Sequence, residues 1–247
     1  MFYINPYFRN PTHRITISVI GIGGTGSFIL SRLARLNFAL QEMGHLGLHV
    51  KAFDPDIIEY FNVGRQNFLP TDVGENKATC MIEKCNFSYG LDWEAYEEYH
   101  SGVMDSNITI CCVDNMKFRK ILYKSKVNSR HKEDFKIPYY LIDCGNGKDF
   151  GQVILSNVND ENRSKSIQKL KTLYDIFPNA DKQDNEMIQG TRGCSYKEKL
   201  EEQDLFINDS IAVDACELLK KMLTVNSIDY QGCIINQSQN KKLPIKI

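Results

Sequence analysis

A glycine cluster between a β-branched run and a helical pattern constrains the fold of this chain most. Residues 15–20, ITISVI, are typical of a buried strand. Residues 21–26, GIGGTG, fit the G-x-G-x-x-G pattern, and apolar residues at helical spacing continue to residue 40. Such glycines let the backbone approach a phosphate, and the N-terminus of the next helix offers free N–H groups. The pattern predicts a nucleotide site, while a purely structural turn remains the alternative. The glycines of this loop are Gly21, Gly23, Gly24 and Gly26.

Strands and helices alternate in the segment that follows. Short apolar runs predict strands at 48–53, 108–113, 139–143 and 152–155. Helical spacing predicts helices at 71–86 and 116–129. This alternation is typical of an α/β fold with a Rossmann-like, doubly wound, mostly parallel sheet and helices on both faces.

The second half of the chain is more polar, and we interpret it as an extension of the first half. We expect one domain over residues 1–247, with a nucleotide-binding part at 1–156 and an extension at 157–247, because the extension has too little apolar content to fold alone. The extension should contain, in order, a polar helix (161–177), a polar crossover loop (178–193), one long helix or two (195–224) and a hairpin (230–247).

Composition excludes several classes of protein. A formal net charge of −1 gives no electrostatic reason to expect a nucleic acid partner. No apolar run approaches the roughly 20 residues that span a bilayer, and the start does not resemble a signal peptide. We therefore expect a soluble, cytoplasmic protein without a membrane partner. None of the eight cysteines stands in C-x-x-C spacing, so no zinc is expected, and most should be small buried side chains.

Polar residues that could carry chemistry follow the predicted strands in order. Asp54 closes the strand at 48–53, where a carboxylate can accept hydrogen bonds from a ribose. Asp114 follows the strand at 108–113, where it could bind Mg²⁺ or merely cap the next helix. The residues between them are Asp56, Asn62, Arg65, Gln66 and Lys77. An isolated arginine or lysine is more often a solvated surface charge, so only the whole set of residues indicates a functional site.

Taken together, these motifs resemble the ThiF/MoeB/ubiquitin-activating superfamily. Its fingerprint is a G-x-G-G-x-G loop, D-x-D with N-x-x-R-Q, a lysine about a dozen residues later and a final D-N. The resemblance implies ATP- and Mg²⁺-dependent adenylation of a carboxylate, typically the C-terminus of a small ubiquitin-like (β-grasp) carrier protein. It assigns the ribose to Asp54, the phosphates to Asn62, Arg65 and Lys77, and the metal to Asp114. Asp56 is a secondary candidate for the nucleotide site that could equally order its own loop, and Gln66, also a candidate there, and Arg119 would have supporting or structural roles.

Other features refine or limit this resemblance. The pattern is most similar to the ThiF-like proteins of plasmid-associated PRTRC cassettes, and the resemblance implies a homodimer. Many relatives carry an arginine-rich segment ahead of the glycine loop that serves the neighbouring subunit, whereas here only Arg9 and Arg14 precede it. A nucleotide-binding scaffold without turnover and an NAD-dependent oxidoreductase remain alternatives. The second would leave the Asn62, Arg65, Lys77 and Asp114 set without a function.

Cys194 is a candidate for covalent chemistry. It lies at the end of the polar loop, beside Arg192 and just ahead of a predicted helix. Both neighbours would lower the pKa of its thiol and favour the nucleophilic thiolate. In relatives that form a covalent bond to their carrier, a cysteine lies on a mobile crossover loop, which implies a thioester role for Cys194. The alternative is a cysteine that merely packs where the helix begins.

Overall fold

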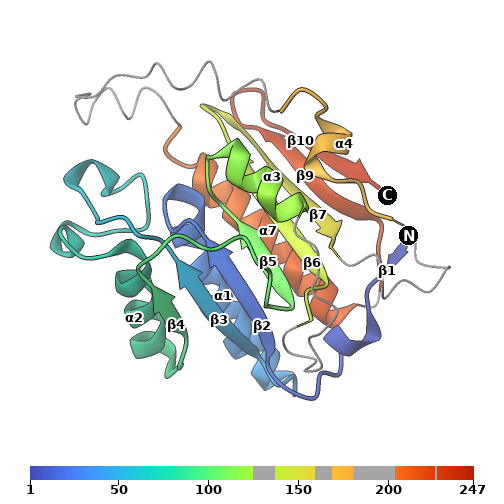
Figure 1. The fold of residues 1–247 in the computed structure, drawn as a ribbon, viewed down its shortest axis with the longest axis horizontal. Helices are drawn as coiled ribbons and strands as arrows, with labels where there is room; N and C mark the ends of the chain where they lie inside the picture. Colours follow the sequence, from blue (N-terminus) through green and yellow to red (C-terminus); the bar gives the residue numbers. More distant parts are fainter. Residues whose placement is uncertain (125–136, 159–168, 181–203, 226) are drawn as a thin grey trace.

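The computed structural model describes residues 1–124, 137–158, 169–180, 204–225 and 227–247, which are built around one large sheet (Figure 1). The eight strands of this sheet lie in the order β10-β9-β7-β6-β5-β2-β3-β4. A separate two-stranded ribbon joins β1 (Phe2–Tyr3) to β8 (Ser227–Ile228), which places the first residues of the chain beside residues 227–228. The predicted α/β class is confirmed.

Five of the eight strands are parallel to one another. The central strand β2 (Ile15–Ile20) pairs with β3 (Leu48–Phe53) on one side and with β5 (Ile108–Cys111) on the other. Beyond them lie β4 (Glu94–Tyr96) and β6 (Tyr140–Asn146). All six residues of β2 are buried, as expected for a β-branched strand covered on both faces. The chain leaves β2 toward β3 and later returns to β5, which places a topological switch point between β2 and β5.

The other three strands of the sheet are antiparallel. β7 (Phe150–Asn157) pairs with β6, and β9 (Tyr230–Asn236) pairs with β7. The hairpin predicted over 230–247 is present, since β9 continues into β10 (Lys241–Lys246) through a turn in which Asn240 has a φ of 48°. The predicted extension therefore completes the sheet.

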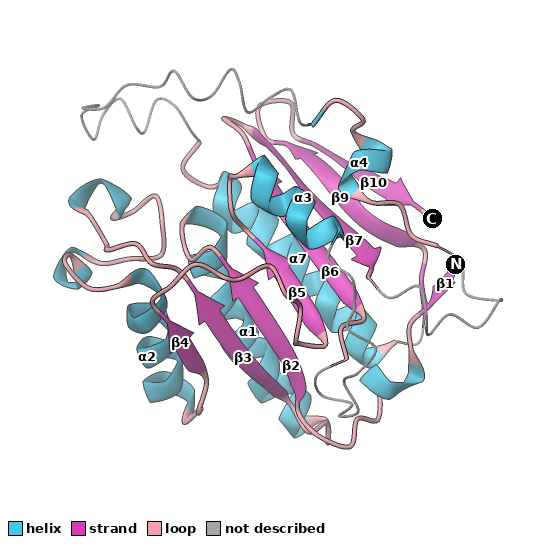
Figure 2. Cartoon of the chain, viewed as in Figure 1, coloured by secondary structure: helices cyan, strands magenta, loops and turns pink. Residues whose placement is uncertain are grey.

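Helices cover both faces of the sheet (Figure 2). Behind the sheet in this view lie α1 (Gly24–Glu42), α2 (Lys77–Tyr89) and α7 (Ile207–Thr224), with α1 between the other two. In front lies α3 (Met116–Lys124), whose Leu122 is fully buried in a small cluster on that face. No helix in the described ranges is long and apolar enough to cross a membrane.

The start of α2 differs from the predicted helix at 71–86. The helix begins at Lys77, where the side chain of Asn76 accepts hydrogen bonds from the N–H groups of Ala78 and Thr79. Ahead of it, Pro70–Asp72 forms a separate 3-10 turn, and Gly74 has a φ of 100°. The prediction placed the start six residues early because it counted this turn as helix and overlooked the capping asparagine.

Two more predicted helices are shorter in the described ranges. Of the helix expected at 161–177, only α4 (Leu173–Ile176) forms in the described part, because Thr172 and Asp175 cap each other and begin a new helix there. Of the helix or helices expected at 195–224, the described part is α7, preceded by a non-helical stretch at 204–206. Residues 125–129, 161–168 and 195–203 lie outside the described residues. The short strands β1, β4 and β8 were not predicted.

Candidate active site

A pocket of about 560 Å³ lies at the carboxyl ends of the parallel strands. Its wall includes the glycine loop after β2, Asp54 after β3, Asp114 after β5 and Asn146 at the end of β6. This edge, beside the switch point, is where open α/β sheets bind their ligands. Of the predicted site residues, those that line the pocket are Gly21, Gly23, Gly24, Asp54, Asp56, Arg65, Gln66, Lys77 and Asp114.

The glycines of the loop serve different purposes. Gly21 has a φ of 85°, and a Cβ on Gly26 would lie 1.9 Å from the carbonyl oxygen of Gly21, so both are required by the close turn between β2 and α1. At Gly23, by contrast, an added Cβ would meet only the side-chain nitrogen of Gln66, 3.9 Å away. Gly23 therefore presents bare backbone to the pocket, next to the free N–H groups at the start of α1.

Asp54 connects the glycine loop to the segment after β3. Its Oδ2 accepts a hydrogen bond from the N–H of Ile22 at 2.6 Å, and its Oδ1 accepts one from the N–H of Asp56 at 2.9 Å. Burial raises the pKa of this carboxyl above its ordinary value, against the opposing effect of these two N–H groups. The carboxylate is 6% exposed and lines the pocket, so it both orders the loop and faces the ligand space.

Lys77 is the buried cation of the pocket wall. It is the first residue of α2, and its Nζ lies 2.8 Å from Oδ2 of Asp56. Asn76 fixes this arrangement, because its side-chain nitrogen donates to the carbonyl oxygens of Asp54 (2.9 Å) and Asp56 (3.1 Å). The exposed fractions of the two paired side chains are 9% for Lys77 and 60% for Asp56, so the pair opens toward solvent on the carboxylate side. Sequence reasoning missed Asn76, although an asparagine ahead of a helical pattern is a recognisable cap.

Arg65 and Gln66 line the pocket from the loop between β3 and α2. Oε1 of Gln66 is buried and lacks a hydrogen-bond partner among the residues described here, an arrangement that a ligand donor could complete. The loop is held to α1 by Asn67, whose N–H donates to Oγ of Ser27 at 3.0 Å. Asn62 does not line the pocket: its Oδ1 accepts from the N–H of Glu59 at 2.9 Å and closes the local turn.

Asp114 reaches the pocket from the end of β5. It does not cap α3, because Oδ1 of Asn115 accepts the hydrogen bond from the N–H of Phe118. In the part of the chain that the structure describes, no donor lies within hydrogen-bond distance of the Asp114 carboxylate, and the residue is exposed. The preceding carbonyl, that of Val113, accepts from Nε of Arg119 at 2.9 Å. Arg119 also pairs with buried Asp143, which fixes the end of β5.

Aromatic side chains form a further part of the pocket wall. This aromatic wall consists of Phe53, His100, Phe118 and the exposed Tyr99. The rings of Phe53 and His100 meet edge to face, with centroids 4.7 Å apart. Burial lowers the pKa of His100 below its ordinary value, which keeps the imidazole neutral. Sequence reasoning missed this wall, since residues 97–105 show neither helical nor strand periodicity.

The cysteines are mostly structural, as expected. Six of the seven that the structure describes are buried, and Cys112 is half-buried at the pocket wall. Burial raises the pKa of Cys85, Cys111 and Cys216 to about 12, so these thiols stay protonated. Cys194, predicted as a nucleophile, lies outside the described residues.

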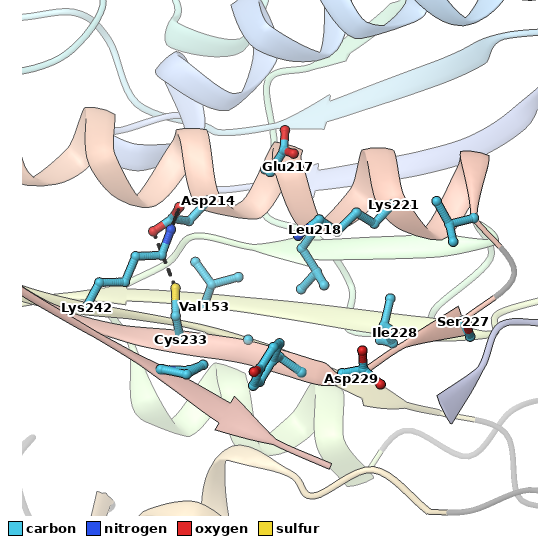
Figure 3. Close-up of a pocket in the computed structure, with 14 residues that line it drawn as sticks. Val153, Asp214, Glu217, Leu218, Lys221, Ser227, Ile228, Asp229, Cys233 and Lys242 are labelled. Atoms are coloured by element: carbon cyan, nitrogen blue, oxygen red, sulfur yellow. Dashed lines mark hydrogen bonds and ion pairs between the residues drawn. The ribbon is translucent and has the colours of Figure 1, made fainter. Parts of the chain in front are cut away.

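A second hollow of about 370 Å³ lies between α7 and the β9–β10 hairpin (Figure 3). Asp214 of α7 accepts a hydrogen bond from the Cys233 thiol at 3.3 Å and forms an ion pair with Lys242. Burial is the main cause that raises the pKa of Cys233 to about 12, so this thiol is not a nucleophile near neutral pH. The hollow lacks the glycine loop and the arginine of the first pocket, and we assign the candidate site to the first pocket.

The first pocket fits a nucleotide with a polyphosphate and one divalent cation. Bare backbone at Gly23, the ammonium of Lys77 and the guanidinium of Arg65 suit the phosphates, while flat aromatic rings suit a base. Mg²⁺ is commonly held by one or two carboxylates together with substrate phosphates and water. Asp114, which is exposed and at the pocket wall, is the residue that could supply such a ligand.

Fold and site together define a Rossmann-like nucleotide-binding protein, and comparisons place it in a family. Residues 9–132 match the ThiF family, and the chain belongs to that family. The fold is similar to a crystal structure of PaaA (TM-score 0.61, 15% identity) and to E. coli MccB with ATP (0.63, 15%). It is also similar to E. coli MccB with AMPCPP and MccA (0.63, 16%). No curated protein sequence matches this chain.

The chain is shorter than these solved relatives. Each of the three alignments covers 94% of this chain, but only 64% of the PaaA chain and 63% of the MccB chains. At 15–16% identity, the likeness establishes the shared fold. The predicted resemblance to the ThiF superfamily is confirmed at the level of the family, while the PRTRC assignment stays a prediction.

Proposed function

We propose that this chain binds ATP with Mg²⁺ and activates a carboxylate as an acyl-adenylate. The substrate that we infer is the C-terminal carboxylate of a small ubiquitin-like (β-grasp) carrier protein. The observation that carries the proposal is one pocket containing the glycine loop, Arg65, Lys77 and Asp114. Membership of the ThiF family and likeness to a MccB structure with ATP support it.

The reaction places demands that these residues suit. A carboxylate oxygen bonds to the α-phosphorus of ATP, the bond from that phosphorus to the bridging oxygen breaks, and pyrophosphate leaves with the bonding electrons. A negative nucleophile must approach negative phosphates, so fixed cations lower the barrier. Arg65 and Lys77 would neutralise the phosphate charge and hold the chain of phosphates in line. Magnesium, with Asp114 as a ligand, would add a further positive charge at the phosphates.

Asp56 gives Lys77 a defined position before any ligand binds. The ion pair at 2.8 Å holds the ammonium at the pocket wall, and the exposed carboxylate can give up its partner to a phosphate at little cost. Preorganised charge of this kind avoids reorganisation during the reaction. The Asp54 carboxylate, fixed by two N–H groups, would accept a hydrogen bond from a ribose hydroxyl.

The binding step can be tested by calorimetric titration of the protein with ATP and Mg²⁺, and separately with NAD. We expect binding of ATP and no preference for NAD. Tight binding of NAD without binding of ATP would identify an oxidoreductase and overturn the proposal.

The turnover step can be tested by mass spectrometry. The protein would be incubated with ATP, Mg²⁺ and candidate carrier proteins, and the carriers examined for the mass of an added adenylate. The matched control is each carrier lacking its last residue. Binding of ATP without adenylation of a panel of carriers and peptide carboxylates would favour a nucleotide-binding scaffold.

The fate of the adenylate can be followed through Cys194. We propose that the thiolate of Cys194 attacks the acyl carbon of the adenylate, so that a thioester forms while the bond to the phosphate oxygen breaks and AMP leaves with the bonding electrons. The Cys194→Ser variant should then adenylate its carrier but form no conjugate that a thiol reductant releases. An unchanged conjugate pattern would leave the chain a purely adenylating enzyme.

A further inference from the structure

A buried asparagine next to the pocket contacts three of the segments that line it. Asn208 lies in the first turn of α7 and is 1% exposed. Its Oδ1 accepts hydrogen bonds from Oγ1 of Thr25, at 3.1 Å, and from the side chain of Asn146. Its Nδ2 is 3.4 Å from the carbonyl oxygen of Arg65, to which it donates. Thr25, Arg65 and Asn146 all line the pocket, whereas Asn208 does not.

The glycine loop fits closely against this amide. A Cβ on Gly24 would lie 2.6 Å from the amide carbon, nitrogen and oxygen of Asn208, a distance that no side chain tolerates. The absence of a side chain at Gly24 therefore leaves room for the Asn208 amide, while at Gly23 an added Cβ would meet only the side-chain nitrogen of Gln66, 3.9 Å away. The start of α1, where phosphates would meet free N–H groups, cannot move toward α7 without displacing this side chain.

The first turn of α7 is itself fixed, so Asn208 can impose a position on the loops. Asp209 forms an ion pair with Arg32 of α1. Just before the helix, the N–H of Asp204 donates to the carbonyl of Lys148 at 2.7 Å. These contacts hold α7 to α1 and to the loop after β6, independently of the pocket.

We propose that Asn208 is a positioning residue for the polyphosphate part of the nucleotide site. It sets the spacing between the start of α1, the Arg65 segment and Asn146, which converge from parts of the chain far apart in sequence. The inference rests on the proposed binding of ATP. Because Asn208 contacts neither the aromatic wall nor Asp54, it should affect binding of the phosphates and leave binding of the nucleoside nearly unchanged.

The test compares ATP with adenosine, each measured by displacement of a fluorescent ATP analogue. Asn208→Ala should weaken ATP binding about tenfold, since it removes all three hydrogen bonds to the pocket segments, and weaken adenosine binding less than twofold. Asn37→Ala is the matched control, because it removes another asparagine that is 1% exposed, whose Oδ1 accepts a hydrogen bond from the N–H of Leu48 at 2.6 Å and which does not line the pocket. It should bind both ligands as the wild type does.

A second variant separates positioning from folding. Asn208→Asp conserves volume and keeps the acceptor for Thr25 and Asn146, but it loses the donor to Arg65 and adds negative charge behind the phosphates. The buried charge should lower the melting temperature, so binding is measured well below the melting temperature of the variant, where Asn208→Asp should lose ATP affinity by more than tenfold. If it bound ATP like the wild type, or if ATP and adenosine weakened equally in both variants, the positioning role would be wrong. Failure of the wild type to bind ATP would instead refute the proposed function, and this inference with it.

Discussion

Two lysines on α2 offer a direct test of the site, because each forms an ion pair but only Lys77 lines the pocket. Nζ of Lys77 pairs with Asp56, and Nζ of Lys84 pairs with Asp72. The two partners differ in burial: the Asp56 side chain is 60% exposed, whereas the Asp72 side chain is 8% exposed. Methionine in place of either lysine keeps most of the apolar stem and removes the charge. The two substitutions should therefore have opposite patterns of effect.

For Lys77→Met, the loss should appear in ligand binding. The freed Asp56 carboxylate returns to water, so the free energy of unfolding should change by no more than about 1 kcal/mol. A charge-assisted contact to phosphate contributes about 1.5–3 kcal/mol, and 1.4 kcal/mol is a factor of ten. We therefore expect the Kd for ATP to rise about 10- to 100-fold, with a melting temperature within about 4 °C of the wild type.

For Lys84→Met, the loss should appear in stability. Asp72 keeps its hydrogen bond from the N–H of Leu69, at 2.6 Å, but its buried carboxylate loses its cation. A charge left without its partner costs about 2 kcal/mol at a site that water partly reaches, which lowers the melting temperature by about 4–8 °C. Binding of ATP should be unchanged, because Lys84 does not line the pocket.

The assay is calorimetric titration with ATP and Mg²⁺, paired with thermal unfolding of each variant without ligand. Wild-type affinity in Lys77→Met would show that this cation does not hold the phosphates. Equal loss of affinity in both variants would show that α2 acts only through the stability of the fold. Either result would refute the assignment of Lys77.

Three further substitutions test other parts of the site. Gly23→Val should abolish ATP binding by filling the ligand space, and it should also lower the melting temperature because the ψ of −133° at Gly23 lies outside the regions that L residues favour; retained binding would contradict the assignment of the loop. Asp114→Asn should raise the Mg²⁺ concentration needed for half-maximal adenylation at least several-fold, and an unchanged requirement would contradict the metal role. His100 has a folded-state pKa below its ordinary 6.5, so as pH falls below that value the unfolded chain binds the proton first and stability declines. His100→Gln should lose less stability than the wild type between pH 7 and 5 in urea unfolding, and equal losses would refute this cause.

The sequence alone determined four of the five parallel strands and the glycines and most of the charged residues of the pocket wall. A β-branched run followed by GIGGTG can form few structures other than a strand, a close turn and a helix start, because glycine is required where Gly21 has a φ of 85° and where Gly26 meets a carbonyl oxygen. Asp54 and Asp114 each follow a strand, and parallel strands bring their carboxyl ends to one edge. Local pattern and known sheet geometry were therefore sufficient for these residues.

Helix ends and short strands were less predictable. The Asn76 cap decides where α2 begins. The side-chain nitrogen of Asn76 donates hydrogen bonds to the carbonyl oxygens of Asp54 and Asp56, which hold the cap in place, and the earlier Pro70–Asp72 segment remains a separate turn. β4 has only three residues and alternates weakly, so its pairing with β3 creates the strand. Such features depend on neighbours that local propensity does not describe.

Only the tertiary structure decided which residues support the site from a distance. Asn208 lies 183 residues after Thr25, with which it shares a hydrogen bond, and no local pattern distinguishes it from other asparagines of the chain. The aromatic wall likewise joins Phe53, His100 and Phe118 from three separate segments. The structure also separated Asn62, which closes its own turn, from Arg65 and Gln66, which reach the pocket. The physical reason is that sequence spacing fixes which side chains share a strand or helix, whereas contacts between elements depend on how their faces pack.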